Sequence, residues 1–178
     1  MDARRGNRFC QGRAEQALQA FAERGCLSLT SGEKATVQAI VDGWENTQQV
    51  VSNPSVLLIA KTNAQVRGLN NEARVQLKRD GRIGGDDIEI AAVTPSGHGQ
   101  TLAFATGDQI RFLVRQDRLG VINGTTATIT HIDGRDSTNP TIHVDMAGRL
   151  AQFQASELAD EQGRIRLAHA YSTTIYGC

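Results

Sequence analysis

Hydrophobic and polar residues alternate over several short segments in the second half of the chain. Within Gln109–Leu113, Ile110 and Phe112 alternate with polar residues, and Thr141–Met146 alternates in the same way. Between such segments, Asn123-Gly124 favours a type I′ turn, which needs positive φ at both central positions. Short strands at this spacing are typical of a small antiparallel barrel.

The first half of the chain follows helical and buried-strand patterns instead. Apolar residues recur at helical spacing in Gly12–Arg24, after Ser31 and in Ala64–Arg79. Val56–Ala60 is a continuous apolar run of the kind that forms a strand buried on both faces of a parallel sheet. Together the two halves predict an α+β protein.

The barrel segment carries the first of three patterns that resemble a known family. Residues 107–129 read GD-x-I-x-F, then a polar loop, then LGV-x-NG. This pattern resembles the SH3-like insertion of superfamily 1 DNA helicases of the RecD type, a family that includes the helicase regions of conjugative relaxases (TraA/MobF-like). Any small β-barrel can also carry such turns.

A second stretch, Leu58–Arg74, resembles the segment that opens the second RecA-like lobe of these helicases, where the turn after the strand lies on single-stranded DNA. The DNA contacts implied here are Lys61, Thr62, Asn63, Arg67, Asn70 and Arg74. Backbone N–H groups and a hydroxyl at a helix N-terminus suit a phosphate oxygen, and cationic side chains add salt-sensitive contacts. Thr62 or Asn63 would equally cap the helix. Asn70 and Arg74 would equally fix packing or solvate the surface.

The third stretch, Leu167–Cys178, resembles the start of a later helicase motif written hGYA-x-T-[IV]-HK. The DNA-backbone contacts implied here are the hydroxyls of Ser172, Thr173 and Thr174. Hydroxyl residues at a strand end are also common on a solvated edge. Tyr176 and Gly177 stand where the family has His and Lys, so the phosphate contact of that lysine is in doubt. On the barrel, Arg111 and Arg115 form a basic edge that would guide a strand, although charge on an exposed hairpin is also common.

The resemblance implies a partial RecA-like α/β motor lobe with an inserted SH3-like antiparallel β-barrel. The lobe would span residues 1–100 and the barrel residues 101–156, and residues 157–178 would return to the lobe as a strand beside Val56–Ala60. The implied function is to hold one DNA strand within an ATP-dependent DNA helicase that acts in conjugative DNA transfer. The alternative is a non-enzymatic protein–protein interaction module built on the barrel.

The sequence contains no phosphate-binding loop of the form G-x-x-x-x-G-K-[ST]. Without such a loop and magnesium ligands, nothing positions or neutralises a transferring phosphoryl group. We therefore expect no catalytic residue, cofactor or metal in this chain and no ATPase activity from it alone. ATP and magnesium would belong to the parent helicase.

Composition says little about the partner and the cellular compartment of the protein. Formal charge sums to zero, with 12 Lys/Arg against 8 Asp/Glu in residues 1–82 and 7 against 11 in residues 83–178. That split mildly favours an anionic partner for the first half. Three scattered cysteines suggest a reducing compartment, and no apolar run is long enough for a bilayer. We expect a cytoplasmic protein that binds single-stranded DNA, together with other conjugative transfer proteins, and no membrane.

Overall fold

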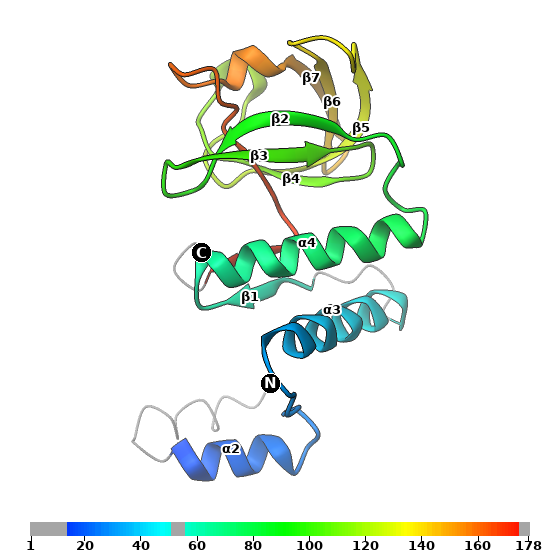
Figure 1. Ribbon diagram of the computed structural model, residues 1–178, viewed down its shortest axis with the longest axis vertical. Helices are drawn as coiled ribbons and strands as arrows, with labels where there is room; N and C mark the ends of the chain where they lie inside the picture. The colour runs from blue at the N-terminus through cyan, green and yellow to red at the C-terminus, as the bar shows by residue number, and fades with distance from the viewer. Residues whose placement is uncertain (1–13, 51–55, 175–178) are drawn as a thin grey trace. The chain divides into compact units, whose positions relative to one another are not determined.

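The computed structural model describes residues 14–50 and 56–174, so the end of the third motif, residues 175–178, lies outside the described residues. The chain divides into two compact units, residues 1–39 and residues 40–178. Helix α2 (Ala14–Ala22) belongs to the first unit, and α3 (Glu33–Val50) begins in it (Figure 1). None of the described helices is both long and apolar enough to cross a membrane.

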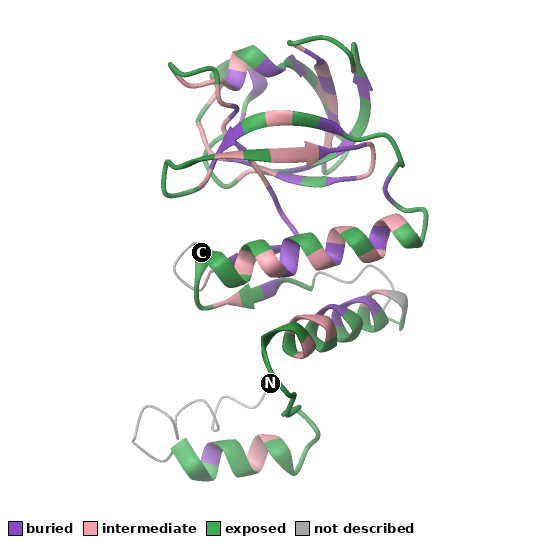
Figure 2. Ribbon diagram, in the orientation of Figure 1, coloured by how far each residue is buried: buried purple, intermediate pink, exposed green. Residues whose placement is uncertain are grey.

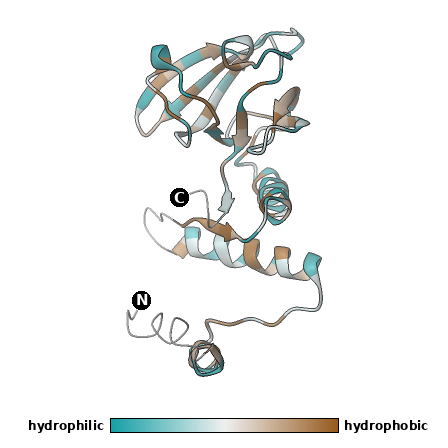
Figure 3. Cartoon of the chain, turned by 90° about the vertical axis from the view of Figure 1, so that its left-hand side faces the viewer, coloured by the Kyte–Doolittle hydropathy of each residue, from teal (hydrophilic) through white to brown (hydrophobic). Residues whose placement is uncertain are grey.

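A two-stranded parallel sheet and one helix form the α/β layer of residues 40–178. Strand β1 (Leu58–Ala60), which Figure 3 colours as hydrophobic, pairs with β9 (Ser172–Thr174) from Leu58↔Ser172 onward. Helix α4 (Asn63–Arg79) packs on both strands, with its buried positions recurring along one side (Figure 2). The pairing confirms that the end of the chain returns to the early apolar strand.

The remaining strands form a β unit made of one sheet and one hairpin. The five-stranded antiparallel sheet has the order β7-β6-β5-β4-β8. Its strands are β4 (Gln109–Phe112), β5 (Thr126–Asp133), β6 (Thr141–Met146), β7 (Arg149–Gln154) and β8 (Leu167–His169). Strands β2 (Ile88–Val93) and β3 (Gly99–Phe104) form the hairpin, and the 3₁₀ helices η1 (Asp117–Leu119) and η2 (Ala155–Leu158) lie in the connections.

The fold is mixed α and β as expected, but the ladders among the described strands leave the sheet open. Strand β8 ends the sheet on one side. The hairpin meets the segment just before β8 through the single bridge Ala92↔Ile165. Backbone bonds from Ile165 N to Ala91 O and from Val93 N to Ile165 O make this bridge. One bridge cannot replace a ladder, so a closed barrel is not shown.

The segment predicted to return to the lobe as one strand, residues 157–178, does not do so as a single strand over its described part. Strand β8 pairs with β4, from Ile110↔His169 to Phe112↔Leu167, and so belongs to the β unit. Ala170 and Tyr171 then carry the chain from the β unit into the α/β layer, where β9 begins. The tail therefore contributes a strand to each sheet.

The Asn123-Gly124 turn also differs from the prediction. Only Gly124 has positive φ, at 96°, because Ala147 is the sole described non-glycine residue with positive φ. Thr125 N donates to Ile122 O at 3.0 Å, which fits a type II turn with glycine in the third position. The type I′ prediction is wrong, since this turn closes a longer loop and does not join β4 directly to β5.

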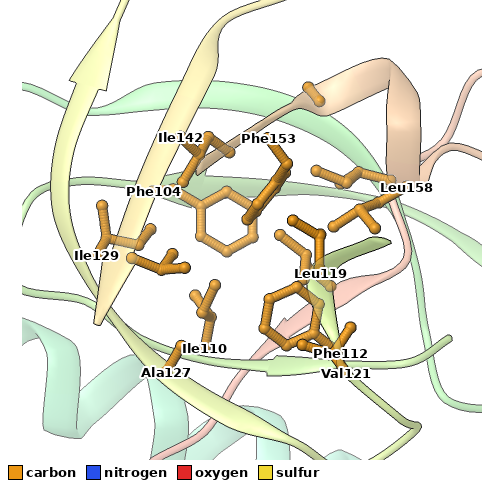
Figure 4. Close-up of a cluster of buried hydrophobic side chains, with 14 of the residues drawn as sticks. Phe104, Ile110, Phe112, Leu119, Val121, Ala127, Ile129, Ile142, Phe153 and Leu158 are labelled. Atoms are coloured by element: carbon orange, nitrogen blue, oxygen red, sulfur yellow. The ribbon is translucent and has the colours of Figure 1, made fainter. Parts of the chain in front are cut away.

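The apolar core of the β unit lies between the sheet and the hairpin, where side chains from most of its strands meet (Figure 4). The rings of Phe112 and Phe153 pack edge to face, with centroids 5.7 Å apart. Ile88 and Leu167, which lie outside residues 101–156, belong to the same core. The division of the chain into residues 1–100, 101–156 and 157–178 remains a prediction.

Replacing Phe153 with alanine should destabilise the protein by about 3–5 kcal/mol, because a fully buried aromatic ring leaves a cavity. Leu150→Ala, in the same strand, is the matched control. The Leu150 side chain is 76% exposed, so its loss should change stability by less than about 0.5 kcal/mol. Urea unfolding measures both, and equal effects of the two substitutions would contradict the assigned core.

Candidate nucleic-acid interface

The turn between β1 and α4 is built as a helix cap. Thr62 is the N-cap residue, and its Oγ1 accepts a hydrogen bond from Gln65 N at 3.2 Å. In return, Gln65 Oε1 accepts from the backbone N of Thr62 and of Lys61, each at 3.2 Å. The structure confirms the capping role, with Asn63 as the first helical residue. The Thr62 hydroxyl keeps its own proton for a further acceptor, and Lys61, Thr62 and Asn63 are all exposed.

A groove runs between α4 and the β2–β3 hairpin, and we call it the α4–β3 groove. Its first part is a cleft of about 250 Å³ beside the N-terminal half of α4. Its second part, of about 450 Å³, shares Asn71, Thr101, Leu102 and His169 with the first and continues to Lys78. Five of the predicted DNA contacts line the cleft, namely Asn63, Arg67, Asn70, Arg111 and Ser172.

The cleft favours an anionic ligand by its charge. None of the described residues that line it is acidic, and Arg67 and Arg111 are its cationic members. Arg67 lies on the exposed side of α4. Along the second part of the groove, Glu89 is the one carboxylate among the described lining residues. A concave surface with one sign of charge attracts the opposite sign.

Arg111 occupies the cleft wall and also binds the last strand. Its Nη1 donates to Thr173 Oγ1 at 3.0 Å and its Nη2 to the carbonyl of Ser172 at 3.1 Å. Ser172 and Thr173 are 1% and 4% exposed, and the Ser172 hydroxyl donates to the Val66 carbonyl at 3.0 Å. The two hydroxyls therefore form neither a solvated edge nor an open DNA contact, and only Thr174 is half-exposed.

Asn70 joins α4 to the same tail. Its Oδ1 accepts from Ser172 N at 2.8 Å, and its Nδ2 donates to the carbonyl of His169 at 3.4 Å. The side chain is buried, so these contacts give it the packing role that the sequence left open.

Arg74 and Asp108 form the centre of a buried polar cluster. Asp108 is fully buried, and its carboxylate accepts from Ala105 N at 2.7 Å, from Tyr171 Oη at 2.8 Å and from Arg74 Nε at 2.9 Å. Arg74 also pairs with Asp87. Burial opposes its charge, but the hydrogen bonds that Arg74 donates to Asp87 and Asp108 outweigh that and raise the pKa of Arg74. Arg74 therefore has the packing role as well, at the junction of helix, hairpin and tail.

Two neighbours of this cluster are held neutral. Burial raises the pKa of Tyr171, and the charge of Asp108 raises it further. Burial lowers the pKa of His169, whose Nε2 lies 2.9 Å from the carbonyl of Ala103. That nitrogen must carry the proton, because a carbonyl can only accept.

Arg115 is a predicted contact that lies apart from the groove. It is exposed and pairs with Asp117 at 2.7 Å, at the start of η1. Conversely, the sequence motifs missed Asn71, Gln100 and Thr101, which line the cleft. Helical spacing gives one signal for Asn71, because Asn63, Arg67 and Asn71 follow each other at four-residue intervals on one face. No group of three His, Cys, Asp or Glu within residues 14–50 and 56–174 is placed to hold a metal ion.

Comparisons with known proteins give structural neighbours only. No family model and no curated protein sequence matches the chain. It is similar to unliganded Pif1 from Bacteroides sp, with 15% identity, 84% of this chain and 41% of that chain covered, and a TM-score of 0.43. Bacteroides Pif1 bound to ssDNA gives 16% identity, 83% and 40% coverage, and a TM-score of 0.42. The chain thus spans about two fifths of the length of these structures, and values at this level do not establish membership of a family.

Asp108→Asn should destabilise the protein by about 3 kcal/mol. The substitution removes the negative partner of a buried ion pair, so the Arg74 guanidinium loses one of its neutralising carboxylates. Asp117→Asn is the matched control, since it breaks an exposed pair and should cost less than about 1 kcal/mol. Urea unfolding of both variants measures the difference. Equal, small losses would mean that Asp108 does not hold the cluster together.

The Asp87 carboxylate should make stability depend on acid pH. Burial opposes its ionisation, but hydrogen bonds from Arg74 and Lys78 outweigh it and lower the pKa of Asp87 below its usual 3.8. A lowered pKa stabilises the fold above the unfolded-state pKa, and this stability is lost as pH falls through the folded-state pKa. Asp87→Asn should therefore be less stable than wild type near pH 7, with the gap shrinking near about pH 3. Unfolding curves at both values test this, and a gap that does not change with pH would refute it.

Proposed function

We propose that this chain holds single-stranded DNA in the α4–β3 groove, as part of an ATP-dependent DNA helicase. The observation that carries the proposal is the cleft beside the N-terminal half of α4, which is bordered by exposed cationic and hydroxyl groups and lacks acidic residues among those described. The sequence resemblance supports the same function, because the matching turn in that family lies on the DNA strand.

Each exposed group at the head of the groove has a distinct task. Lys61 and Arg67 supply positive charge for successive phosphates, and Arg67 also lines the cleft. The Thr62 hydroxyl, already accepting from Gln65 N, donates its proton to a phosphate oxygen. Asn63 offers an amide from the first turn of the helix. These are phosphate contacts, so they position the strand without reading its sequence.

The less exposed residues among the predicted DNA contacts lie beneath this surface and support it. Asn70 and Ser172 fasten β9 to α4, and Arg111 links Ser172 and Thr173 of β9 to the β unit. Through β9, their hydrogen bonds join α4 to strand β4 of the β unit. We therefore propose them as positioning residues and leave the direct contacts to the exposed head of the groove.

The wider setting of the proposal rests on the sequence resemblance. The β unit would correspond to an SH3-like insertion, and the parent protein to a relaxase/helicase of the TraA type that acts in conjugative DNA transfer. ATP and magnesium would be bound by the parent, and this chain would contribute strand holding without hydrolysis. The protein-binding alternative would use the exposed apolar side chains of the β unit, Ile122 and Leu150.

Binding of a fluorescent oligo-dT should be weak and should fall steeply with salt, because released counterions supply most of the affinity. For Lys61→Ala combined with Arg67→Ala, the slope of log K against log salt should become shallower by about 1.4, about 0.7 for each lost single-strand phosphate contact. Fluorescence anisotropy across a salt series measures both constants.

Arg79→Ala is the matched control, because Arg79 is exposed on the last turn of the same helix and does not line the groove. It removes a positive charge without touching the proposed contacts, so the slope should be unchanged. If Arg79→Ala lowers the slope as much per charge as the groove variant, the chain attracts DNA by general charge only. If wild type shows no salt-sensitive binding at low ionic strength, the strand-holding function is wrong.

A further inference from the structure

We propose that the cleft at the head of the α4–β3 groove is a pocket for one unstacked base of the bound strand. This proposal rests on the strand-holding function and adds that the protein holds a base as well as phosphates.

The inner surface of the cleft suits a flat heterocycle better than a phosphate. Val66, Leu102 and Leu113 give it apolar walls. A phosphate would lose its hydration against such side chains without gaining enough charge in return. Of the two arginines, Arg111 already directs Nη1 and Nη2 at the last strand, which leaves Arg67 at the exposed side of α4 as the main cation.

His169 strengthens this preference. It lines both parts of the groove, and burial lowers the pKa of its imidazole, so the ring is neutral near pH 7. Its Nε2–H donates a hydrogen bond to the Ala103 carbonyl, which fixes the tautomer. A neutral imidazole adds no attraction for an anion. The ring itself is mostly covered, because His169 is 7% exposed and Phe104 packs against it edge to face at 5.2 Å.

Polar groups for the edge of the base come from Asn71, Gln100 and Thr101, which line the same cleft from α4 and from β3. The Gln100 Nε2 donates to the Val93 carbonyl at 3.3 Å, which leaves its Oε1 as an acceptor. Asn71 is exposed at the end of the Asn63, Arg67, Asn71 row and carries both a donor and an acceptor. Amides in such positions can pair with the hydrogen-bonding edge of a base.

The cleft, which is the smaller of the two parts of the groove, has a size that suits one small unit of the strand. Its volume of about 250 Å³ is below the range of about 300–1,000 Å³ that is usual for drug-sized ligands. A single base fits this description, whereas a duplex does not. Arg67 lines the cleft, and Lys61 is exposed in the turn that precedes α4. Their charges would hold the phosphates of that nucleotide outside the cleft.

The test compares two oligonucleotides of equal length and charge, one of dT and one in which abasic sites replace the bases. Both keep every phosphate, so any difference in affinity comes from the bases. Wild type should bind oligo-dT at least about fivefold more tightly than the abasic strand, which is the low end of what one held base contributes. Fluorescence anisotropy at fixed low salt measures both dissociation constants.

Asn71→Ala and Thr101→Val should each bring the oligo-dT affinity closer to that of the abasic strand, with an unchanged salt slope. Both side chains are exposed, so folding should survive either substitution. Gln152→Ala, at an exposed position of β7, is the control and should leave the ratio unchanged.

Equal, salt-sensitive binding of both oligonucleotides by wild type would overturn the base pocket and leave the strand-holding function standing. A dT preference that neither Asn71→Ala nor Thr101→Val reduces would also overturn it, because the bases would then be held elsewhere. Failure to bind either strand would remove the strand-holding function and the pocket together.

Discussion

The fully buried carboxylate of Asp108 constrains how the α/β layer and the β unit meet. A carboxylate without solvent is tolerated only when other groups neutralise it and saturate its oxygens. Here Arg74 comes from α4, Tyr171 from the crossover between β8 and β9, and the Ala105 N–H from the turn that carries Asp108 itself. Because each partner belongs to a different segment, satisfying one charge brings helix, tail and hairpin together.

The neighbouring glycine completes this constraint. Gly107 has φ of 94°, and a Cβ there would collide with the carbonyl oxygen of Arg82, just beyond α4. The turn therefore packs directly against the backbone that follows the helix, at a distance only glycine permits. With α4 and β3 held in this way, the exposed residues of the first helical turn and the hairpin side chains face a common groove.

Local signals in the sequence predicted the parts that depend on near neighbours. The strand at β1, the Thr62 cap and the alternation in β4 and β6 are each encoded within a few residues, and the structure has these elements. The prediction that Val56–Ala60 is buried on both faces is wrong, because only Leu58 is buried there and Ile59 is 54% exposed. The roles of Arg74 and Tyr171 were hidden because their shared partner lies 34 and 63 residues away. An exposed DNA contact and a buried ion pair look the same in a sequence, since both need an arginine.

The same limit explains the other corrections. The φ of Asn123 depends on a long loop in which Gly124 N donates to Phe112 O, so the dipeptide alone did not determine the turn type. Likewise, the sequence allowed Ser172 and Thr173 to lie on a solvated strand edge. In the structure, Ser172 bonds to Asn70 and Thr173 accepts from Arg111. Asn71 and Thr101 belong to no motif, and only the approach of α4 to β3 makes them neighbours.

The α4–β3 groove is proposed as the surface on which a single strand lies. NMR chemical-shift mapping of the backbone amides during titration with oligo-dT tests it most directly. The account predicts that the largest shifts fall on Lys61–Asn71 and Thr94–Leu102, with strands β5 to β7 almost unchanged. Shifts concentrated on Thr126–Gln154, with the groove amides unmoved, would contradict it.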